Sequence, residues 1–364
     1  MQNNNPGNFY NALVKAIGYA AGVVILLWLL YKISWVVLLL LFVVVLALII
    51  NAPVAALERK KMRRFWACLI VFGSIILIMT LLAWLIFPKI NEQFRALINN
   101  LPSYADQLTR NVAAWFTDYP DVSKQIREEG SNLSKWIPSV PTTLIRIGNF
   151  SLSILSTVLI IIVFMSMVVY AVTNPRPLVE LYFSFFSPHQ REKAKIALLN
   201  TSTMLIGWIR SNIIGGTIEA VCITIFLSAL NVPGAWVWGA LTFFAQFIPR
   251  IGFYIMAIPP ILVSLSMSGA TALWVTIFLL GLDEIMGDFV LPKVRSSTMN
   301  IHPVSLLFSL LAMGTAFGLI GILMATPLTA IIKAYYEEFY LTQFEDDRHM
   351  KERIDSIVYR NKPI

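Results

Sequence analysis

The chain has 364 residues, of which 57% are hydrophobic and only 13% are charged, and its mean hydropathy is +0.72. A soluble domain of this length would carry about twice that charge, so the composition excludes one and indicates a polytopic membrane protein. The net charge of +8 fits the Lys and Arg residues that anchor cytoplasmic loops. Because these residues do not gather on a polar domain, we expect no nucleic-acid partner.

Two apolar runs open the chain, one from Ala12 to Tyr31 and one from Trp35 to Ile50. The first run is long, lacks a small-residue cleavage site and leads directly into the second, so we interpret it as a retained helix and not as a signal peptide. The basic loop Glu58–Arg64 follows. By the positive-inside rule this loop is cytoplasmic, which places the amino terminus in the cytoplasm as well.

A third span is predicted from Phe65 to Phe87, with Pro88 closing it. Residues 88–149 mix charges of both signs with scattered apolar side chains, and three crossings from the inside place them outside the membrane. Their spacing predicts an amphipathic helix. This external segment either packs on the protein's own helices, binds a partner or covers the bilayer surface.

The fourth predicted span, Phe150–Val172, returns the chain to the cytoplasm, where residues 178–212 are expected to form an amphipathic helix on the membrane surface. The fifth span, Ile213–Leu230, carries Glu219 in its first half. A charged carboxylate inside the bilayer is costly unless it is paired or faces a water-filled cavity. Glu219 is therefore either a cation or proton site, or one partner of a salt bridge to Arg210.

Residues 236–268 form an apolar run that is too long for one crossing and too short for two. Gln246, Pro249, Arg250 and Gly252 interrupt the run. Proline disfavours helical geometry in the residue before it, and glycine permits unusual backbone angles. We predict a broken segment whose free helix-end groups, with Arg250 beside them, line a pathway; the alternative for Arg250 is a side chain that extends to the interface.

A second apolar run of awkward length covers residues 303–333, and Gly314, Gly318, Gly321 and Pro327 suggest that it is broken. The crossing from Ala272 to Ile285 precedes it and brings Glu284 and Asp288 to the inner side. If both broken segments are re-entrant, the first enters from outside and the second from inside, and the binding site lies between their tips. The alternative is that each is one long tilted or kinked helix.

The predicted fold is all-α, a polytopic transmembrane helical protein with two broken or re-entrant helical segments. Its parts are three amino-terminal spans (1–87), an external amphipathic segment (88–149), a fourth span with a cytoplasmic helix (150–212), a transport core (213–333) and a cytoplasmic tail (334–364). The predicted substrate or ion pathway comprises Asn212, Glu219, Gln246, Pro249, Arg250, Gly252, Glu284, Asp288 and Gly318.

Enzymatic function is not expected. The three histidines, His189, His302 and His349, have no metal-binding spacing, and the sequence contains no HExxH, Gly-x-Ser-x-Gly or Walker A motif. We expect no catalytic residues, no metal and no cofactor. The alternative from another class is a membrane scaffold or channel without coupled transport, held together by glycine-mediated helix packing.

Four sequence patches resemble one known family, the autoinducer-2 exporter family of bacterial permeases, over most of the chain. The patches are Phe87-Pro88 with Leu101-Pro102; Phe247-Ile248-Pro249 with Gly252; Gly287-Asp288 through Leu291-Pro292-Lys293 to His302-Pro303; and Gly318-Leu319-Ile320-Gly321 with Pro327-Leu328. The resemblance implies a multi-pass protein of the bacterial cytoplasmic (inner) membrane, with both termini in the cytoplasm. It further implies a homo-oligomer, such as a pentamer, that exports a small solute through the lipid bilayer.

The resemblance implies two kinds of substrate, because members of this family have been associated with the quorum-sensing signal autoinducer-2 and others with sodium-proton exchange. One departure concerns the site. The family pattern has an acidic residue, glycine and asparagine before Leu-Pro-Lys, whereas this chain has Met286, Gly287 and Asp288. The family's substrate contacts are therefore not carried over to this segment.

The two substrates make different chemical demands. Autoinducer-2 is small and rich in hydroxyl groups, so its site needs hydrogen-bonding groups and aromatic faces. A sodium-proton exchanger needs a buried carboxylate that takes either ion, and Glu219 or Asp288 would serve. The candidate hydrogen-bonding residues for autoinducer-2 are Asn212, Thr217, Gln246, Arg250 and Tyr254.

Overall fold

The structure is a computed structural model, and it describes residues 6–116, 118–136, 151–249, 251–291, 301–343 and 357. Within these ranges every regular element is a helix, and no strand occurs. The predicted all-α fold is therefore confirmed. By length and apolar composition, four helices of the described residues can cross a membrane, or five if one bent helix pair forms a single span.

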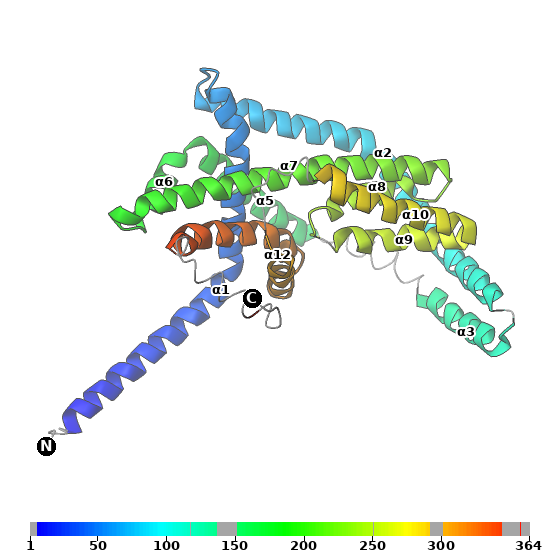
Figure 1. The fold of residues 1–364 in the computed structure, drawn as a ribbon, viewed down its shortest axis with the longest axis horizontal. Helices are drawn as coiled ribbons and strands as arrows, with labels where there is room; N and C mark the ends of the chain where they lie inside the picture. Colours follow the sequence, from blue (N-terminus) through cyan, green and yellow to red (C-terminus); the bar gives the residue numbers. More distant parts are fainter. Residues whose placement is uncertain are drawn as a thin grey trace, which may run out of the picture.

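Two very long helices open the chain. Helix α1 (Pro6–Glu58) is continuous through residues 32–34, where we had expected a break, because no proline or glycine interrupts it there. Helix α2 (Arg64–Trp115) likewise continues past Pro88. Pro88 therefore does not end the helix, because a proline inside a long helix can kink it without ending it; that the third span ends there remains a prediction. Figure 1 shows α1 bending along its length and α2 turning down toward α3 (Pro120–Trp136).

The second half of α2 packs on the carboxy-terminal helices. Gln93 accepts a hydrogen bond of 2.9 Å from the backbone N–H of Trp236, at the beginning of α8. Asn111 donates bonds of 3.0 Å to the carbonyl groups of Leu265 and Ser266, at the end of α9. Part of the predicted external segment thus packs on the protein's own helices and satisfies helix-end groups there.

Helix α5 (Ser151–Thr173) is followed by α6 (Pro175–Ser184), and the two axes differ by 84°. A short 3₁₀ turn, η1 (Pro188–Gln190), leads into α7 (Arg191–Ala229). Helix α7 joins the predicted cytoplasmic helix and the predicted fifth span into one straight element. At 1.5 Å per residue its length is about 58 Å, well beyond a hydrocarbon core of about 30 Å.

Helices α8 (Ala235–Ala245) and α9 (Gly252–Met267) are the first broken segment. Each is too short to cross the membrane in the way that a full span does, and a six-residue turn joins them. Both pack into one apolar cluster with α7 and α10, and Figure 1 shows them lying along α7. Helix α10 (Gly269–Ile285) follows and runs into a π-helical turn, η2 (Met286–Val290).

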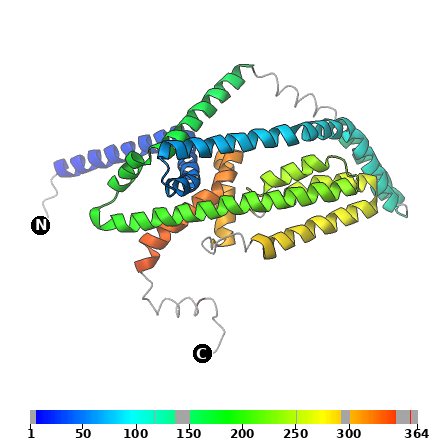
Figure 2. The same cartoon turned by 90° about the horizontal axis from the view of Figure 1, so that it is seen from above.

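The second broken segment is α12 (Pro303–Phe339), which is followed by a 3₁₀ turn, η3 (Leu341–Gln343). Its interruption is Gly318, with φ 59° and ψ −141°. The two arms fold back on each other, because Ser309 donates a hydrogen bond of 3.2 Å to the carbonyl of Ala325, sixteen residues later. Figure 2 shows the arms of α12 diverging from a common apex. Both broken segments predicted from the sequence are confirmed.

Helix α7 contributes to two apolar clusters of the described residues. Its carboxy-terminal half, with Ile223 and Leu227, packs against the α8–α9 hairpin and α10. Its amino-terminal half, with Met204 and Leu205, packs against α12 and α1. The two hairpins therefore lie along one helix, each on a different half. The division of the chain into five segments remains a prediction.

Candidate substrate and ion pathway along α7

One face of α7 is buried and carries an unusual number of small and polar side chains. Thr201, Asn212 and Glu219 are all buried on it. They are eleven and seven residues apart, which is close to three turns and two turns of an α-helix, so their side chains leave the helix in the same direction. The face is a polar line that runs through the part of the protein shared by both hairpins.

Glu219 is completely buried, with 0% of its surface exposed. One carboxylate oxygen, Oε2, accepts a hydrogen bond from the side-chain amide of Gln246, and the other, Oε1, has no hydrogen-bond partner among the described residues. No Lys, Arg or His forms an ion pair with Glu219 in the ranges that the structure describes. The salt bridge to Arg210 that we considered from the sequence is not formed, and Arg210 is exposed.

The turn between α8 and α9 places Gln246 beside Glu219. The backbone amides of five turn residues donate to carbonyl groups in or next to the turn; they belong to Gln246, Phe247, Ile248, Ile251 and Gly252. The expected free helix-end amides are therefore absent at these positions, because the turn satisfies its own backbone. The turn contributes to the site through the Gln246 side chain.

Pro249 and Gly252 shape this turn. The carbonyl of Pro249 accepts a bond of 2.7 Å from the N–H of Ile251. Gly252 does not have the unusual backbone angles that we expected, since positive φ among the described glycines occurs only at Gly234 and Gly318. Glycine is required at position 252 for space instead: a Cβ atom there would lie 2.1 Å from the carbonyl oxygen of Ala245.

Small residues let α8 approach α7 closely. A Cβ atom on Gly239 would lie 2.0 Å from Oγ1 of Thr224 and 2.7 Å from the carbonyl oxygen of Ala220. A Cβ atom on Gly216 would lie 3.1 Å from the carbonyl oxygen of Phe243. The contact between Gln246 and Glu219 therefore depends on two glycines, one on each helix, that allow the backbones to meet.

Asn212 lies two turns before Glu219 on the same face and is 2% exposed. Its amide nitrogen Nδ2 has no hydrogen-bond partner in the described part of the chain. The aromatic ring of Trp208, one turn earlier, lies edge-on to the ring of Phe247 in the turn, with 6.0 Å between their centroids. An unpaired donor, an unpaired acceptor and aromatic rings thus occur on neighbouring turns of α7.

The second hairpin meets α7 at its other half. Thr201 on α7 and Thr326 on α12 are both buried, and neither hydroxyl has a hydrogen-bond partner. At the apex of the hairpin, the ring of Phe317 packs edge-on against Trp35 of α1, with centroids 5.6 Å apart. Gly318 therefore lies beside α1, whereas Asn212, Glu219 and Gln246 gather on the α7 face next to the first hairpin.

The acidic residues near η2 divide into two groups. Glu284 and Asp288, which we had placed in the pathway, are exposed, while Asp283 is half-buried and interacts electrostatically with Glu219. Sequence reasoning missed Asp283, although the pattern contained the signal. Position 283 continues the buried stripe of Ala272, Val275, Leu279 and Met286 at helical spacing, whereas positions 284 and 288 do not.

Three other residues were candidates for the pathway or for binding autoinducer-2: Arg250, Thr217 and Tyr254. Arg250 lies outside the described residues. Thr217 is exposed, and its hydroxyl donates to the carbonyl of Ile213 on the same helix. Tyr254 is 49% exposed. In the described part of the chain, no three His, Cys, Asp or Glu side chains lie close enough to hold a metal ion.

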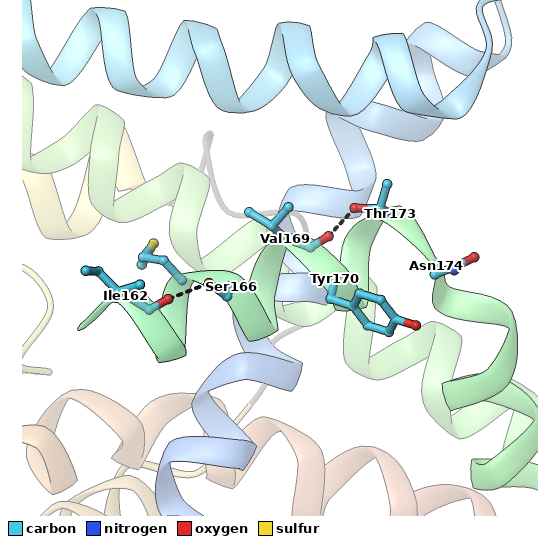
Figure 3. Close-up of a pocket in the computed structure, with 7 residues that line it drawn as sticks. Ile162, Ser166, Val169, Tyr170, Thr173 and Asn174 are labelled. Atoms are coloured by element: carbon cyan, nitrogen blue, oxygen red, sulfur yellow. Dashed lines mark hydrogen bonds between the residues drawn. The ribbon is translucent and has the colours of Figure 1, made fainter. Parts of the chain in front are cut away.

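A shallow groove lies elsewhere, along α5 (Figure 3). It begins at Ile162 and ends at Asn174, next to the bend into α6, and none of the predicted pathway residues lines it. The buried polar face of α7 and the open groove on α5 are therefore separate features.

Comparison with known proteins places residues 19–341 within the model of one family, described as the AI-2E family transporter. YueF of Bacillus subtilis, provisionally named a transport protein, is 23% identical over 78% of this chain and 79% of its own length. A Haemophilus influenzae protein with a similar provisional name is 26% identical over 93% of this chain and 94% of its own. TqsA of Escherichia coli, named an AI-2 transport protein, is 34% identical over 31% of this chain and 33% of its own.

Proposed function

The chain belongs to the AI-2E transporter family, and from that premise we propose that this multi-pass membrane transporter exports a small polar solute along the buried face of α7. One observation carries the proposal. Among the residues that the structure describes, Asn212 and Glu219 bury a donor and an acceptor without partners on one helix face. Buried polar groups are nearly always paired, so orphaned groups of this kind indicate a place where water, an ion or a solute binds.

The chemistry of this face suits a small molecule rich in hydroxyl groups. One hydroxyl of the solute can donate to Oε1 of Glu219 and another can accept from Nδ2 of Asn212, and the rings of Trp208 and Phe247 offer an apolar wall. Autoinducer-2 belongs to this chemical class. The name of the E. coli relative TqsA agrees with that choice.

Alternating access is the proposed mechanism. The α8–α9 hairpin contacts α7 at Glu219 through a single side chain, Gln246, while its backbone amides are satisfied within the turn. In the proposed movement of the hairpin relative to α7, the hydrogen bond between Gln246 and Glu219 is exchanged and the close packing at Gly216 and Gly239 shifts. We propose that the two hairpins enter the membrane from opposite faces, so that movement of each opens the α7 face to one side.

A second candidate function, sodium-proton exchange, is favoured by one observation. Glu219 has no cationic partner in the described ranges, and the nearby Asp283 carboxylate adds negative potential. Two carboxylates near one buried site attract a proton or a cation. In this variant of the proposal, Glu219 couples the movement of the solute or of sodium to the movement of a proton.

Flux measurements in proteoliposomes test both candidates. The variants are Glu219→Gln and, as a matched control, Glu284→Gln, which removes an exposed carboxylate from α10. We expect Glu219→Gln to lower the flux of autoinducer-2 by about tenfold or more, since a hydrogen bond to a charged group contributes roughly 1.5–3 kcal/mol. The control should transport as the wild type does.

The same vesicles distinguish the two functions. If a pH gradient drives sodium movement in the wild type and Glu219→Gln abolishes this movement, the function is sodium-proton exchange. Loss of autoinducer-2 flux without any sodium movement would assign solute export. If Glu219→Gln transports both at the wild-type rate, Glu219 does not lie on the pathway.

Assembly and orientation belong to the same proposal. We place the protein in the bacterial inner membrane with both termini in the cytoplasm, because the basic turn between α1 and α2 fits the positive-inside rule. We also propose a homo-oligomer, such as a pentamer. The first part of α1 supports this, because it extends away from the other helices with an exposed apolar surface, as Figure 1 shows.

A further inference from the structure

The groove on α5 ends at Asn174, where the chain bends sharply from α5 into α6. Helix α5 is an apolar helix of 23 residues, and its part from Val158 to Thr173 meets the length and composition of a membrane span together with α6, whose axis differs by 84°. If α5 crosses the membrane, α6 lies nearly parallel to the membrane surface. Its exposed apolar residues Leu178 and Leu181, with Phe185 directly after it, then enter the boundary between headgroups and acyl chains. The bend therefore marks the depth at which lipid headgroups lie.

The groove itself has the length of one lipid chain. From Ile162 to Asn174 it spans twelve residues, or about 18 Å along the helix, which is similar to half of a hydrocarbon core of about 30 Å. Its inner part is lined by Ile162 and Met165, and its outer end by Tyr170 and Asn174 (Figure 3). An apolar groove with a polar outer end suits an acyl chain below a headgroup.

A basic turn is fixed to the same bend. Arg64, at the beginning of α2, donates bonds of 2.9 and 2.6 Å to the carbonyl of Val172, one residue before the groove-lining Thr173. Its guanidinium also binds Glu58 at 2.8 Å and Asn51 at 2.7 Å. These hydrogen bonds of Arg64 connect the turn between α1 and α2 to the carboxy-terminal end of α5.

The turn between α1 and α2 carries positive charges that no acidic residue of the described ranges neutralises. Arg59, Lys60, Lys61 and Arg63 are exposed, and none of the four forms an ion pair within the described ranges. The one acidic residue beside them, Glu58, is already bound to Arg64. Phe65 and Trp66 follow, both more than half exposed, as expected for rings at a membrane interface.

We infer that the groove on α5 and the basic turn at residues 59–63 together bind an anionic phospholipid. One acyl chain lies along α5 from Asn174 toward Ile162, and the phosphate lies beside the turn. Charge complementarity selects the anionic headgroup, since the turn that Arg64 bonds to the end of α5 carries four exposed cations, whereas no charged residue lines the groove. The positive-inside rule alone would explain the cations but not the groove that Arg64 holds beside them.

Native mass spectrometry of the detergent-purified full-length protein tests the inference, with dioleoyl phosphatidylglycerol and dioleoyl phosphatidylcholine as probes. One variant replaces Arg59, Lys60, Lys61 and Arg63 by Gln. Its matched control replaces four cations on α7 by Gln: Arg191, Lys193, Lys195 and Arg210. We expect the turn variant to lose about tenfold or more in phosphatidylglycerol affinity, because each cation near a surface contributes to anionic-lipid binding. The α7 control should keep its affinity.

A second pair of variants tests the groove. Val169→Trp fills it, whereas Val221→Trp adds the same bulk to an exposed position on α7. Val169→Trp should weaken the binding of both phosphatidylglycerol and phosphatidylcholine. Val221→Trp should leave the binding of both lipids unchanged. Thermal unfolding of each variant shows whether it is folded.

Three results would overturn the inference. The first is a turn variant that binds phosphatidylglycerol as the wild type does. The second is an equal loss in the α7 control, which would indicate unspecific attraction. The third is displacement of the lipid by glycerol phosphate, which would indicate a site for the headgroup alone.

Discussion

Glu219 illustrates how a membrane protein keeps a costly group. A buried carboxylate without a cation beside it is strongly disfavoured, and the described contacts give it a single hydrogen bond, from Gln246. The burial of Asn212 with an unpaired amide adds a second cost on the same face. Two such costs on one helix face are consistent with a site that a solute or ion completes.

The hydrogen bond between Gln246 and Glu219 can be measured by a double-mutant cycle. Gln246→Leu should lower the free energy of unfolding by about 1–3 kcal/mol, because it leaves both oxygens of Glu219 unpaired. The double variant Glu219→Leu/Gln246→Leu should recover most of that loss. Unfolding by SDS titration in mixed micelles measures the four proteins. Additive effects would show that the two side chains do not interact.

At the level of residues, the sequence was sufficient where one position stood out from its surroundings. Glu219 is a single carboxylate in an apolar run, and Gln246 interrupts another such run. Asp283 was harder to choose, because three acidic residues lie within six positions and only the helical register relative to α7 separates them. That register depends on tertiary packing.

At the level of elements, both hairpins depend on glycines, but for different physical reasons. Gly239 provides space between α7 and α8, and Gly318 provides a backbone conformation. The sequence predicted the breaks at Gly318 and near Pro249. It did not predict that α2 would continue past Pro88, because whether a proline kinks or ends a helix depends on the packing of the residues that follow it.

Close packing at Gly239 can be tested by adding one methyl group. Gly239→Ala should lower the free energy of unfolding by about 1–3 kcal/mol, because the new Cβ would lie 2.0 Å from Oγ1 of Thr224. It should also lower transport by moving Gln246 away from Glu219. Gly281→Ala is the control, since no atom lies within 4 Å of its Cβ position. SDS titration and proteoliposome flux are the measurements, and equal behaviour of the two variants would contradict this account.

The apex of α12 gives a test in which space plays no part. At both Gly318 and Gly73, no atom lies within 4 Å of the position that a Cβ atom would occupy, but only Gly318 has a positive φ, of 59°. Gly318→Ala should therefore cost about 1–3 kcal/mol, while Gly73→Ala should be neutral or slightly stabilising. Melting temperatures in detergent compare the two. A Gly318→Ala protein as stable as the wild type would show that the apex is not strained.

At the level of the whole molecule, α7 is the element on which both hairpins pack. Its length of about 58 Å exceeds the bilayer, so it can contact one hairpin near each membrane face. The sequence suggested two separate pieces here, because apolar content changes near residue 213 even though the helix does not. Helix continuity was the part of the fold that hydropathy alone could not predict.

The accessibility of Asn212 to water tests the central claim most directly. Asn212→Cys and, as a control on the exposed face of α7, Val221→Cys are made in a protein in which Cys68 and Cys222 are replaced by Ala. Each is treated in membranes with a charged, water-soluble methanethiosulfonate reagent, and labelling is measured by mass. We predict that Asn212→Cys is labelled and that autoinducer-2 slows its labelling, while Val221→Cys stays unlabelled. An unreactive cysteine at position 212 from both sides of the membrane would contradict a pathway along α7.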